Sequence, residues 1–315
     1  MTRVLGVDGG NTKTLALVAD GDGQVLASGR SGCGDIYGAA SPEAALDAIA
    51  EAAAPTLDGP IDAAAFSLAG ADWPEDFVFL ERELRARLPL PGPVVIVNDS
   101  LGALRAGSPD WTGIALVAGT GNAVGARHGD GRIFHLGFWP DGAGGWHLAG
   151  EGLRAVYRAE LGIGPATVLT ERALALYDAP DPIAMLHEFT RRGGRPRADR
   201  DRFAPLVLDA AEDGDAVAAA IVAAQGKVLG EQGRVCAQRV GLPLDGARVV
   251  LAGGVFSHPS DVLADAAMAE LPGAYAVRGV APPVVGALLL GFDRLGVDVD
   301  IEGGLAPWAA SASIT

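Results

Sequence analysis

One pattern occurs twice in this chain, and it limits the folds that the sequence can adopt. Each copy has a short apolar run, a glycine-rich loop, a second apolar run, an Asp-Gly turn and a third run. The copies cover residues 3–29 and 113–137, and they start about 110 residues apart. Short apolar runs between glycine turns predict strands, so each copy should form three consecutive antiparallel strands. Two copies of this unit indicate two structurally related halves.

Helices and further strands are predicted around the two copies. Ser41 before Pro42 is typical of a helix N-cap and first turn, and this helix should continue through Ala54. Asp72, with Glu75 three residues later, predicts a capping-box start to a second helix. Strands are expected at 62–70, 93–99 and 248–253, a mostly helical region at about 150–240, and a final helix at 282–296. The sequence therefore predicts an α/β protein.

Composition excludes several classes of protein. The 315 residues include 24 Lys and Arg against 39 Asp and Glu, which gives a formal net charge of -15 at pH 7. This balance is unfavourable for binding nucleic acid or an anionic membrane surface, and neither partner is expected. Two cysteines, Cys33 and Cys236, are too few for a disulfide framework or a four-cysteine metal site. The apolar runs are too short for a signal peptide or a membrane span, so a cytoplasmic protein is predicted.

Glycines make up 45 of the 315 residues and gather in four clusters that follow predicted strands. The clusters lie after Asp8, at 119–121, at 142–145 and at 253–254. Glycine loops after strands let backbone N–H groups approach a phosphate, although each cluster could also be a tight turn only. Lys13 follows Thr12 instead of a glycine, which excludes a P-loop. A hairpin, not a helix, is expected after the second cluster, which excludes a dinucleotide-binding fingerprint.

Equivalent glycine loops in two related halves fit a pair of facing hairpins that hold a triphosphate from both sides of a cleft. Asp8, at the end of the first strand, is a candidate Mg²⁺ ligand, directly or through water. Thr12 and Lys13 are candidates for contact with phosphate oxygens. The alternative for Asp8 is a structural role, in which its side chain caps the turn.

Taken together, these motifs resemble the N-acetylglucosamine kinase/BadF-type ATPases of the actin-like, sugar-kinase and heat-shock ATPase superfamily, from Gly6 to about Gly296. GVDGGNTKTLALVADGDGQVLASG is similar to the first phosphate motif of that family, LVAGTGNA to the second and VVLAGGVF to its adenosine motif. SLAGADWPED, GAGGW and FAPLVLDAAEDGDAVAAAI are further similar stretches. The resemblance implies an α/β fold of two ribonuclease-H-like domains around a central cleft that binds ATP and Mg²⁺, with a homodimer as a possible assembly.

The resemblance also implies domain boundaries and a catalytic base. The N-terminal domain covers 1–112, the C-terminal nucleotide-binding domain covers 113–283, a helix at about 284–297 packs at their junction, and 298–315 form a tail. Asp99 matches the base that accepts the proton of the acceptor hydroxyl as that oxygen attacks the γ-phosphate. From the residues alone, Asp99 could equally cap a helix that begins at Ser100.

The remaining site residues follow from the matched motifs. Phosphate and acceptor contacts fall on Gly9, Gly10, Asn11, Thr12, Lys13, Gly119, Thr120, Gly121 and Asn122, and the nucleotide pocket on Gly253, Gly254 and Phe256. The acceptor pocket falls on Asp72, Asp99, Gly145, Trp146 and Glu151. Trp146 could instead be an ordinary core aromatic, because sugar stacking needs an exposed ring face. The five histidines show no ligand spacing, so zinc is not expected.

The chain departs from the family pattern in the loops that contact the acceptor. Amino-sugar kinases of the family carry an Asp where this chain has Gly150, and an Asn in the loop that here reads SGCGDIYG, residues 31–38. Asn11 stands where a third glycine is common. Asp35 and Glu151 are candidates to replace the missing polar contacts.

The resemblance therefore implies an ATP-dependent phosphotransferase that acts on a hydroxyl of a sugar or amino sugar, as N-acetylglucosamine and glucosamine kinases do. One alternative is an ATPase that activates a partner enzyme, although such activators hold an iron–sulfur cluster with cysteines that Cys33 and Cys236 do not match. The other is a sugar- or nucleotide-binding sensor without turnover. The identity of the acceptor, the hydroxyl that is phosphorylated, the retention of turnover and the oligomeric state stay open at this stage.

Overall fold

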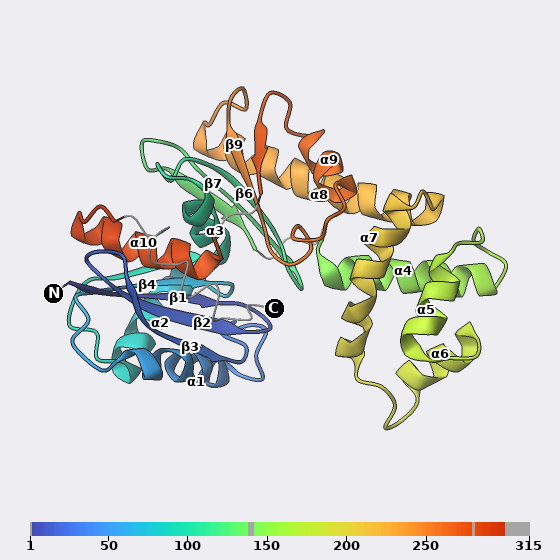
Figure 1. Cartoon of the computed structure of the whole chain (residues 1–315), viewed down its shortest axis with the longest axis horizontal. Helices are drawn as coiled ribbons and strands as arrows, with labels where there is room; N and C mark the ends of the chain where they lie inside the picture. Colours follow the sequence, from blue (N-terminus) through green and yellow to red (C-terminus); the bar gives the residue numbers. More distant parts are fainter. Residues whose placement is uncertain (1, 138–141, 279–280, 300–315) are drawn as a thin grey trace.

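The computed structural model describes residues 2–137, 142–278 and 281–299. Within these ranges the chain forms two five-stranded sheets, each flanked by helices (Figure 1). The strand orders are β3-β2-β1-β4-β5 and β10-β9-β6-β7-β8. Each sheet thus consists of three antiparallel strands in sequence followed by two strands parallel to the first. The prediction of two related halves is confirmed.

The first sheet is built from strands that the sequence predicts. Val4 and Leu5, neighbours in β1, face opposite cores, as the alternation of side chains along a strand requires. Val4 packs with α10, and Leu5 packs with residues of α1 and α2 on the other face. The elements of this half are β1 (Arg3–Gly9), β2 (Thr14–Asp20), β3 (Val25–Ser31), α1 (Pro42–Ala53), η1 (Ala54–Thr56), β4 (Ala63–Leu68), α2 (Pro74–Arg87), β5 (Val94–Asn98) and α3 (Asp99–Gly107).

The second half repeats this sheet and adds a helical insertion, which Figure 1 shows on the side away from the first sheet. The sheet strands are β6 (Gly113–Ala118), β7 (Asn122–Arg127), β8 (Ile133–Leu136), β9 (Arg248–Ala252) and β10 (Tyr275–Val277). The helices are α4 (Gly145–Glu160), α5 (Leu169–Tyr177), α6 (Pro182–Thr190), η2 (Arg197–Phe203), α7 (Ala204–Glu212), α8 (Ala216–Val240), α9 (Val262–Met268) and α10 (Pro283–Leu295). The sequence reading missed β10, whose three residues are too few to show an alternating pattern.

The start of α2 differs from the predicted capping box. The helix begins at Pro74, and Trp73 occupies the N-cap position. The carboxylate of Asp76, not Glu75, accepts hydrogen bonds from the backbone N–H of Trp73 at 2.7 Å and of Asp72 at 3.2 Å. The predicted cap at Asp72 is therefore wrong, because the box lies one residue further along the chain. The Asp72 side chain is left available for other contacts.

Helix α10 returns to the first half and packs between the sheet and α3 (Figure 1). Glycines allow this close approach: a Cβ on Gly286 would lie 1.9 Å from the carbonyl oxygen of Gly102 in α3, and one on Gly6 would lie 2.5 Å from the backbone nitrogen of Leu288. Val97, Ala115 and other buried residues of β4, β5, α3, β6, β9 and α10 then form one apolar cluster between the two sheets. The two halves are thus joined by core packing as well as by the chain.

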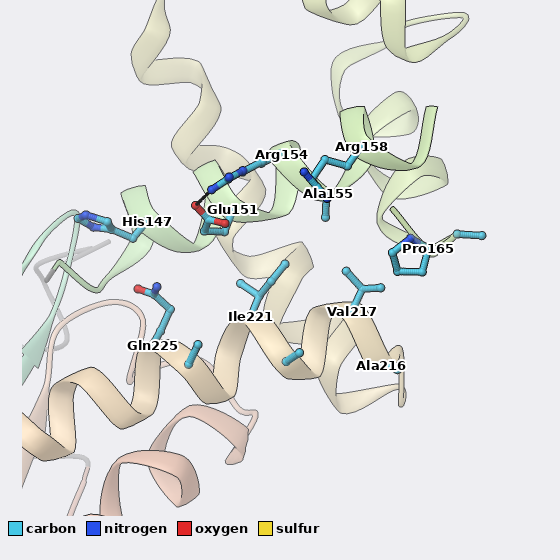
Figure 2. A pocket seen from close by; sticks show the side chains of 13 residues that line it. His147, Glu151, Arg154, Ala155, Arg158, Pro165, Ala216, Val217, Ile221 and Gln225 are labelled. Carbon is cyan, nitrogen blue, oxygen red and sulfur yellow. Dashed lines mark hydrogen bonds and ion pairs between the residues drawn. The ribbon is translucent and has the colours of Figure 1, made fainter. Parts of the chain in front are cut away.

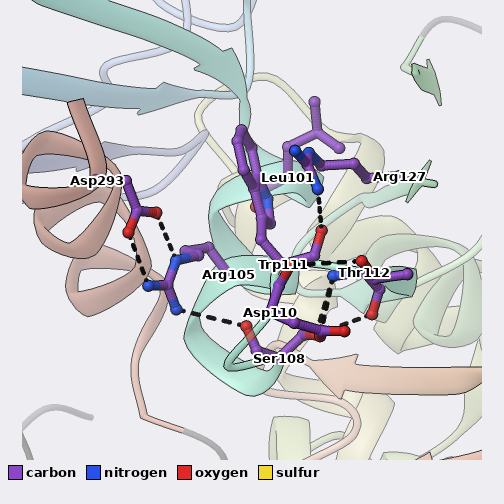
Figure 3. Close-up of polar contacts among 8 residues, drawn as sticks. All are labelled: Leu101, Arg105, Ser108, Asp110, Trp111, Thr112, Arg127 and Asp293. Atoms are coloured by element: carbon purple, nitrogen blue, oxygen red, sulfur yellow. Dashed lines mark hydrogen bonds and ion pairs between the residues drawn. The ribbon is translucent and has the colours of Figure 1, made fainter. Parts of the chain in front are cut away.

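Residues 108–112 carry the chain from α3 into the second sheet, and Figure 3 shows how this connection is held. Arg105 of α3 forms a bidentate ion pair with Asp293 of α10, with N–O distances of 2.7 and 3.0 Å. Trp111 has a φ of 51°, which is unusual for a bulky side chain. Its carbonyl accepts a 3.0 Å hydrogen bond from Arg127 of β7, whose guanidinium lies 4.3 Å from the ring centroid. The connection is thereby anchored to both halves.

None of the helices in the described ranges is long and apolar enough to cross a lipid bilayer. The tail expected at 298–315 lies almost wholly outside the described residues.

The contact between α10 and α3 provides a test of the fold. Replacing Gly286 with Ala should lower the free energy of unfolding by about 2–3 kcal/mol, because the new methyl group meets backbone atoms that cannot rotate away. Gly150→Ala is the matched control, since a Cβ there meets nothing within 4 Å in a helix; it should be neutral or stabilise by about 0.5–1 kcal/mol. Urea denaturation of both variants gives the comparison. Equal stability of Gly286→Ala and the parent chain would contradict the packing described.

Candidate functional site

Three parallel strands of the first sheet end at one edge, and their ends carry the candidate catalytic residues. In the parallel register Asp8 of β1 is opposite Ser67 of β4, and Leu68 of β4 is opposite Asn98 of β5. Because carboxyl ends of parallel strands meet at one edge, Asp8 and the residues that follow β4 and β5 come together there. Asp99 thus lies close enough to both Asp8 and Asp72 for the charges to interact, although the three lie far apart in the sequence.

Asp99 is the first residue of α3, and its neighbour performs the capping role. Asn98 is the N-cap, and its side-chain oxygen accepts hydrogen bonds from the backbone N–H of Ser100 at 3.1 Å and the Ser100 hydroxyl at 2.6 Å. The Oδ1 atom of Asp99 is buried and has no hydrogen-bond partner among the described residues. Leaving a buried carboxylate oxygen unpaired is costly, so such an atom is a candidate for contact with a substrate. The reading in which Asp99 itself caps the helix is wrong.

Asp72 lies between the two halves. Its Oδ1 accepts a 3.0 Å hydrogen bond from the side-chain amide of Asn98, and it lies 4.0 Å from Nδ1 of His135 in β8. Asn98 thus holds both the start of α3 and the Asp72 carboxylate. The sequence reading did not single out Asn98, and the only signal for it was an amide at the end of a strand directly before the candidate base.

Burial, with a smaller contribution from neighbouring negative charges, raises the pKa of the carboxyl groups at this edge. Burial, followed by the charge of Asp99, raises the pKa of Asp8 to about 7, although nearby Lys13 opposes the shift. Burial, followed by the charges of Asp99, Asp35 and Asp76, raises the pKa of Asp72 to about 7. Burial raises the pKa of Asp99 to about 6, with a smaller contribution from the charge of Asp35. Perturbed carboxyl groups gathered in this way are typical of functional sites.

Asp35 belongs to the same group and is held by the first phosphate loop. One of its carboxylate oxygens accepts a 3.0 Å hydrogen bond from the side-chain amide of Asn11, and the other accepts a 2.9 Å bond from the backbone N–H of Tyr37. The Tyr37 hydroxyl in turn donates to Asp76 at 2.7 Å. Asn11, which departs from the family's glycine, thus contacts the loop 31–38, which also departs from the family pattern. The two departures are spatially linked.

The two glycine hairpins meet across the junction of the halves. Thr12 of the β1–β2 loop and Thr120 of the β6–β7 loop are joined by a 2.8 Å hydrogen bond between their hydroxyl groups. The first loop is closed by a hydrogen bond from the backbone N–H of Gly10 to the carbonyl of Lys13. The strand that follows the second loop, β7, confirms the predicted hairpin. The facing arrangement expected from the repeated pattern is therefore present.

Two further glycine segments of the second half, 142–145 and 253–254, converge behind the Thr120 loop. The backbone N–H of Gly145 donates to the carbonyl of Gly119, and that of Trp146 donates to the carbonyl of Thr120. The side-chain oxygen of Asn122 accepts from the backbone N–H of Ala143 at 2.8 Å. Gly253 has a φ of 93°, and a Cβ on it would lie 2.4 Å from the carbonyl oxygen of Ala118, so glycine is required there.

Other predicted residues lie further from the carboxylates. Phe256, expected in the nucleotide pocket, is only 5% exposed and packs in the core of the second half. Trp146 is 62% exposed, so it is not the ordinary core aromatic of the alternative reading. Glu151 lies in a groove between α4 and α8 and pairs with Arg154 at 3.4 Å (Figure 2). The structure thus brings Asp8, Asp72 and Asp99 together but places Glu151 with a different set of residues.

The cysteines do not form a common site. Cys33 is partly exposed in the loop after β3. Cys236 is buried within α8, where its thiol donates to the carbonyl of Val124 and burial raises its pKa to about 12. The described residues contain no group of three or more His, Cys, Asp and Glu side chains arranged to hold a metal ion.

Comparisons with known proteins identify the family of this chain and several relatives. The model of the BadF/BadG/BcrA/BcrD ATPase family matches residues 5–291. N-acetyl-D-glucosamine kinase of Dictyostelium discoideum is 24% identical over 91% of this chain and 96% of its own length. N-acetylmuramic acid/N-acetylglucosamine kinase of Clostridium acetobutylicum is 28% identical over 54% of this chain and 58% of its own.

Solved structures resemble the whole molecule. A candidate N-acetylglucosamine kinase from Chromobacterium violaceum gives a TM-score of 0.66 at 26% identity and covers 92% of this chain and 99% of its own. A ROK family glucokinase from Streptomyces griseus, solved with glucose and AMPPNP, gives a TM-score of 0.61 at 19% identity, with the same coverage of both chains. The second likeness shows the fold alone, and together they confirm the predicted two-domain sugar-kinase fold.

The raised pKa of Asp99 has a consequence for stability. A carboxyl group whose folded-state pKa exceeds its unfolded value costs stability once it ionises, so the cost appears between about pH 4 and pH 6 and remains above this range. Asp99→Asn should therefore melt about 2–4 °C above the parent chain at pH 8, with a smaller difference at pH 4.

The control for this variant is Asp22→Asn, which changes an exposed carboxylate in the β2–β3 turn. It should show no such pH-dependent difference. Thermal melts across the pH range measure both variants, and a lower melting temperature of Asp99→Asn at pH 8 would contradict the burial argument.

Proposed function

The chain belongs to the BadF/BadG/BcrA/BcrD ATPase family, and we propose that it transfers the γ-phosphoryl group of ATP to a hydroxyl of a sugar or amino sugar. The observation that carries this proposal is the unpartnered, buried Oδ1 of Asp99, at the sheet edge where the two glycine hairpins meet. The curated relatives are kinases of N-acetylated amino sugars, which supports the same reaction class.

Asp99 acts as the general base. Its carboxylate accepts the proton of the acceptor hydroxyl while that oxygen forms its bond to the γ-phosphorus and the bond to the β,γ-bridging oxygen breaks. With a pKa of about 6, the carboxylate is mostly ionised at neutral pH yet remains basic enough to take a proton. Asn98 positions this group, because it caps α3 and also donates to Asp72.

The hairpin loops hold the phosphates. Gly9, Gly10, Thr12 and Lys13 approach from the first half, and Gly119, Thr120 and Gly121 from the second. A Cβ on Gly119 or Gly121 would meet nothing within 4 Å, so both loop positions border open space. The hydrogen bond between Thr12 and Thr120 marks the point where the triphosphate would pass, and both hydroxyl groups can turn towards phosphate oxygens. The adenosine lies towards Gly253, Gly254 and Phe256.

The residues present fit Mg²⁺. This ion prefers oxygen ligands and is usually held by one or two carboxylates together with substrate phosphates. Asp8 supplies such a carboxylate, and because burial and the charge of Asp99 raise its pKa despite nearby Lys13, a divalent cation beside it would stabilise its ionised form. When bound, Mg²⁺ would neutralise charge on the phosphates. Asp8 would hold the ion, directly or through water.

The acceptor is bound near Asp72 and Asp99. Asp72 is positioned between the halves, where it can accept a hydrogen bond from a sugar hydroxyl, and Asp35 adds a negative charge on the same side. Trp146 presents an exposed ring for stacking, and Gly145 begins α4 beside it. Relative movement of the halves about residues 108–112 would bring α4 closer and exclude water from the reaction. The relatives favour an amino sugar as the acceptor class.

A homodimer is a possible assembly of this kinase. The cytoplasm remains its predicted location.

The assignment of Asp99 as base can be tested by substitution. Asp99→Asn should reduce sugar-stimulated ADP release by about 10²–10⁴-fold, since the amide cannot accept the hydroxyl proton. Affinity for ATP should stay within a few-fold of the parent. A coupled ADP assay over a panel of hexoses and amino sugars, with Asp22→Asn as control, measures the effect. Sugar binding without any ADP release by the parent chain would favour the sensor, and full activity in Asp99→Asn would contradict the role of this carboxylate.

The pKa values also predict a pH profile. Because the base is active only when ionised, kcat/KM should fall as the pH decreases through about 7 to 6, where Asp72 and Asp99 take up protons. The decline should approach tenfold per pH unit below pH 6. Initial rates at subsaturating sugar and saturating ATP give this profile. A rate that stays constant down to pH 5 would show that no such carboxyl group controls the reaction.

A further inference from the structure

A groove of about 740 Å³ separates α4 from the first turns of α8 (Figure 2), and of the residues predicted for the kinase site only Glu151 lines it. This volume lies within the range of small-molecule binding sites. His147, Glu151, Arg154 and Arg158 line it from α4. Their spacing of four, three and four residues places them along one face of the helix. The opposite face of α4 is buried in the core of the second half.

The inner end of the groove contains two buried polar atoms without partners. They are Nδ1 of His147 and Oε1 of Gln225, and neither has a hydrogen bond to a described residue. Both side chains line the groove, and Figure 2 shows the Gln225 amide turned towards the side of α4 that carries His147 and Glu151. Unpaired buried polar atoms are uncommon, and each requires an explanation. An amide oxygen only accepts hydrogen bonds, so the matching ligand group is a hydroxyl or N–H donor.

The middle of the groove is apolar and its outer end is basic, in contrast to the polar inner end at His147 and Gln225. Val217 and Ile221 of α8, with neighbouring alanines, give the groove an apolar floor. Arg158 stands at the outer end, while Arg154 turns back along α4 to its carboxylate partner Glu151 at 3.4 Å (Figure 2). Among the described residues, Arg158 has no carboxylate partner. Arg158 donates to the carbonyl of Ile163 at 3.0 Å, which fixes its position without neutralising its charge. A local excess of positive charge in a chain of net charge -15 favours an anion.

We propose that this groove is a second binding site, for a small amphipathic organic anion. The ligand has a hydroxyl or amine donor at one end for Gln225, an apolar body over Val217 and Ile221, and a carboxylate or phosphate at the other end for the arginines. Arginine guanidinium groups are well suited to planar anions of this kind.

The groove is connected to the phosphate loop through both of its helices. On α4, His147 follows Trp146, whose backbone N–H donates to the carbonyl of Thr120. On α8, Gln232 lies two turns after Gln225 and accepts a 3.1 Å hydrogen bond from the side chain of Asn122. A ligand that spans α4 and α8 therefore changes the affinity of the Thr120 loop for ATP, and by linkage ATP changes the affinity for the ligand.

The proposal is tested with 6-hydroxy-2-naphthoate, a fluorescent probe that carries a donor, a flat apolar body and a carboxylate. Fluorescence titration of the full chain should give one site with a Kd on the order of 10–100 µM. 2-Naphthoate, which lacks the hydroxyl, and 2-naphthol, which lacks the carboxylate, should each bind at least about tenfold more weakly. Equal binding of the three compounds, or no binding of the probe at 1 mM (about ten times the weakest Kd expected), would overturn the proposal.

Variants identify the location of the probe. Arg154→Gln with Arg158→Gln, and separately Gln225→Leu, should weaken probe binding about tenfold while thermal melts show that the protein is folded. Arg82→Gln with Arg192→Gln, two exposed arginines elsewhere, is the matched control and should bind as the parent does. ATP or sugar at saturation should shift the Kd of the probe without abolishing binding. Complete competitive displacement by either would show that the groove belongs to the kinase site and would overturn a second site.

Discussion

The central physical constraint in this structure is that several carboxyl groups lie close together at one edge of the first sheet, where ionising them costs free energy. Asp8, Asp72 and Asp99 come together where β1, β4 and β5 end, and their pKa values rise mainly because of burial, with a smaller contribution from the charges of neighbouring carboxylates. Among the described residues, the positive charge of Lys13 opposes this rise at Asp8. Such an arrangement is unfavourable in the free protein and becomes favourable when a cation, a hydroxyl donor or both are bound. Binding energy is thus available at the place where phosphoryl transfer needs it.

The packing of the rest of the fold keeps these carboxylates close together although their negative charges repel. The apolar cluster between the sheets, the glycine contacts of α10 and the Arg105–Asp293 ion pair keep the two halves in register. The exposed part of that ion pair contributes little by itself, so the packing of α10 is the stronger constraint. Trp111, with its positive φ and its contacts to both halves, marks the segment about which the halves would rotate.

The sequence predicts the fold well and the site in part. The repeated strand, glycine loop and hairpin pattern depends on local preferences, and it identified both sheets and the facing loops. The motif proposes Asp99 as the base, whereas the role of Asn98 as the N-cap of α3 is visible only in the structure. Contacts such as that between Asn11 and Asp35 join residues 24 positions apart, and the contact between Thr12 and Thr120 spans 108. Patterns in a single sequence carry no information on such distant pairs. For the same reason the sequence could not show that Glu151, expected beside Asp99, lies in the α4–α8 groove.

The proposed kinase activity and the proposed second binding site rest on different parts of the molecule. The first depends on the carboxylates at the sheet edge, and the second depends on α4 and α8. The central claim is that Asp99 is a half-buried carboxylate, with Oδ1 fully buried, that is made more basic by its surroundings. NMR titration of ¹³C-labelled aspartate carboxyl groups in the free protein, with the signal assigned by its loss in Asp99→Asn, measures this directly. The account predicts that Asp99 titrates with a pKa of about 6. A value near 4, that of an ordinary exposed aspartate, would contradict it.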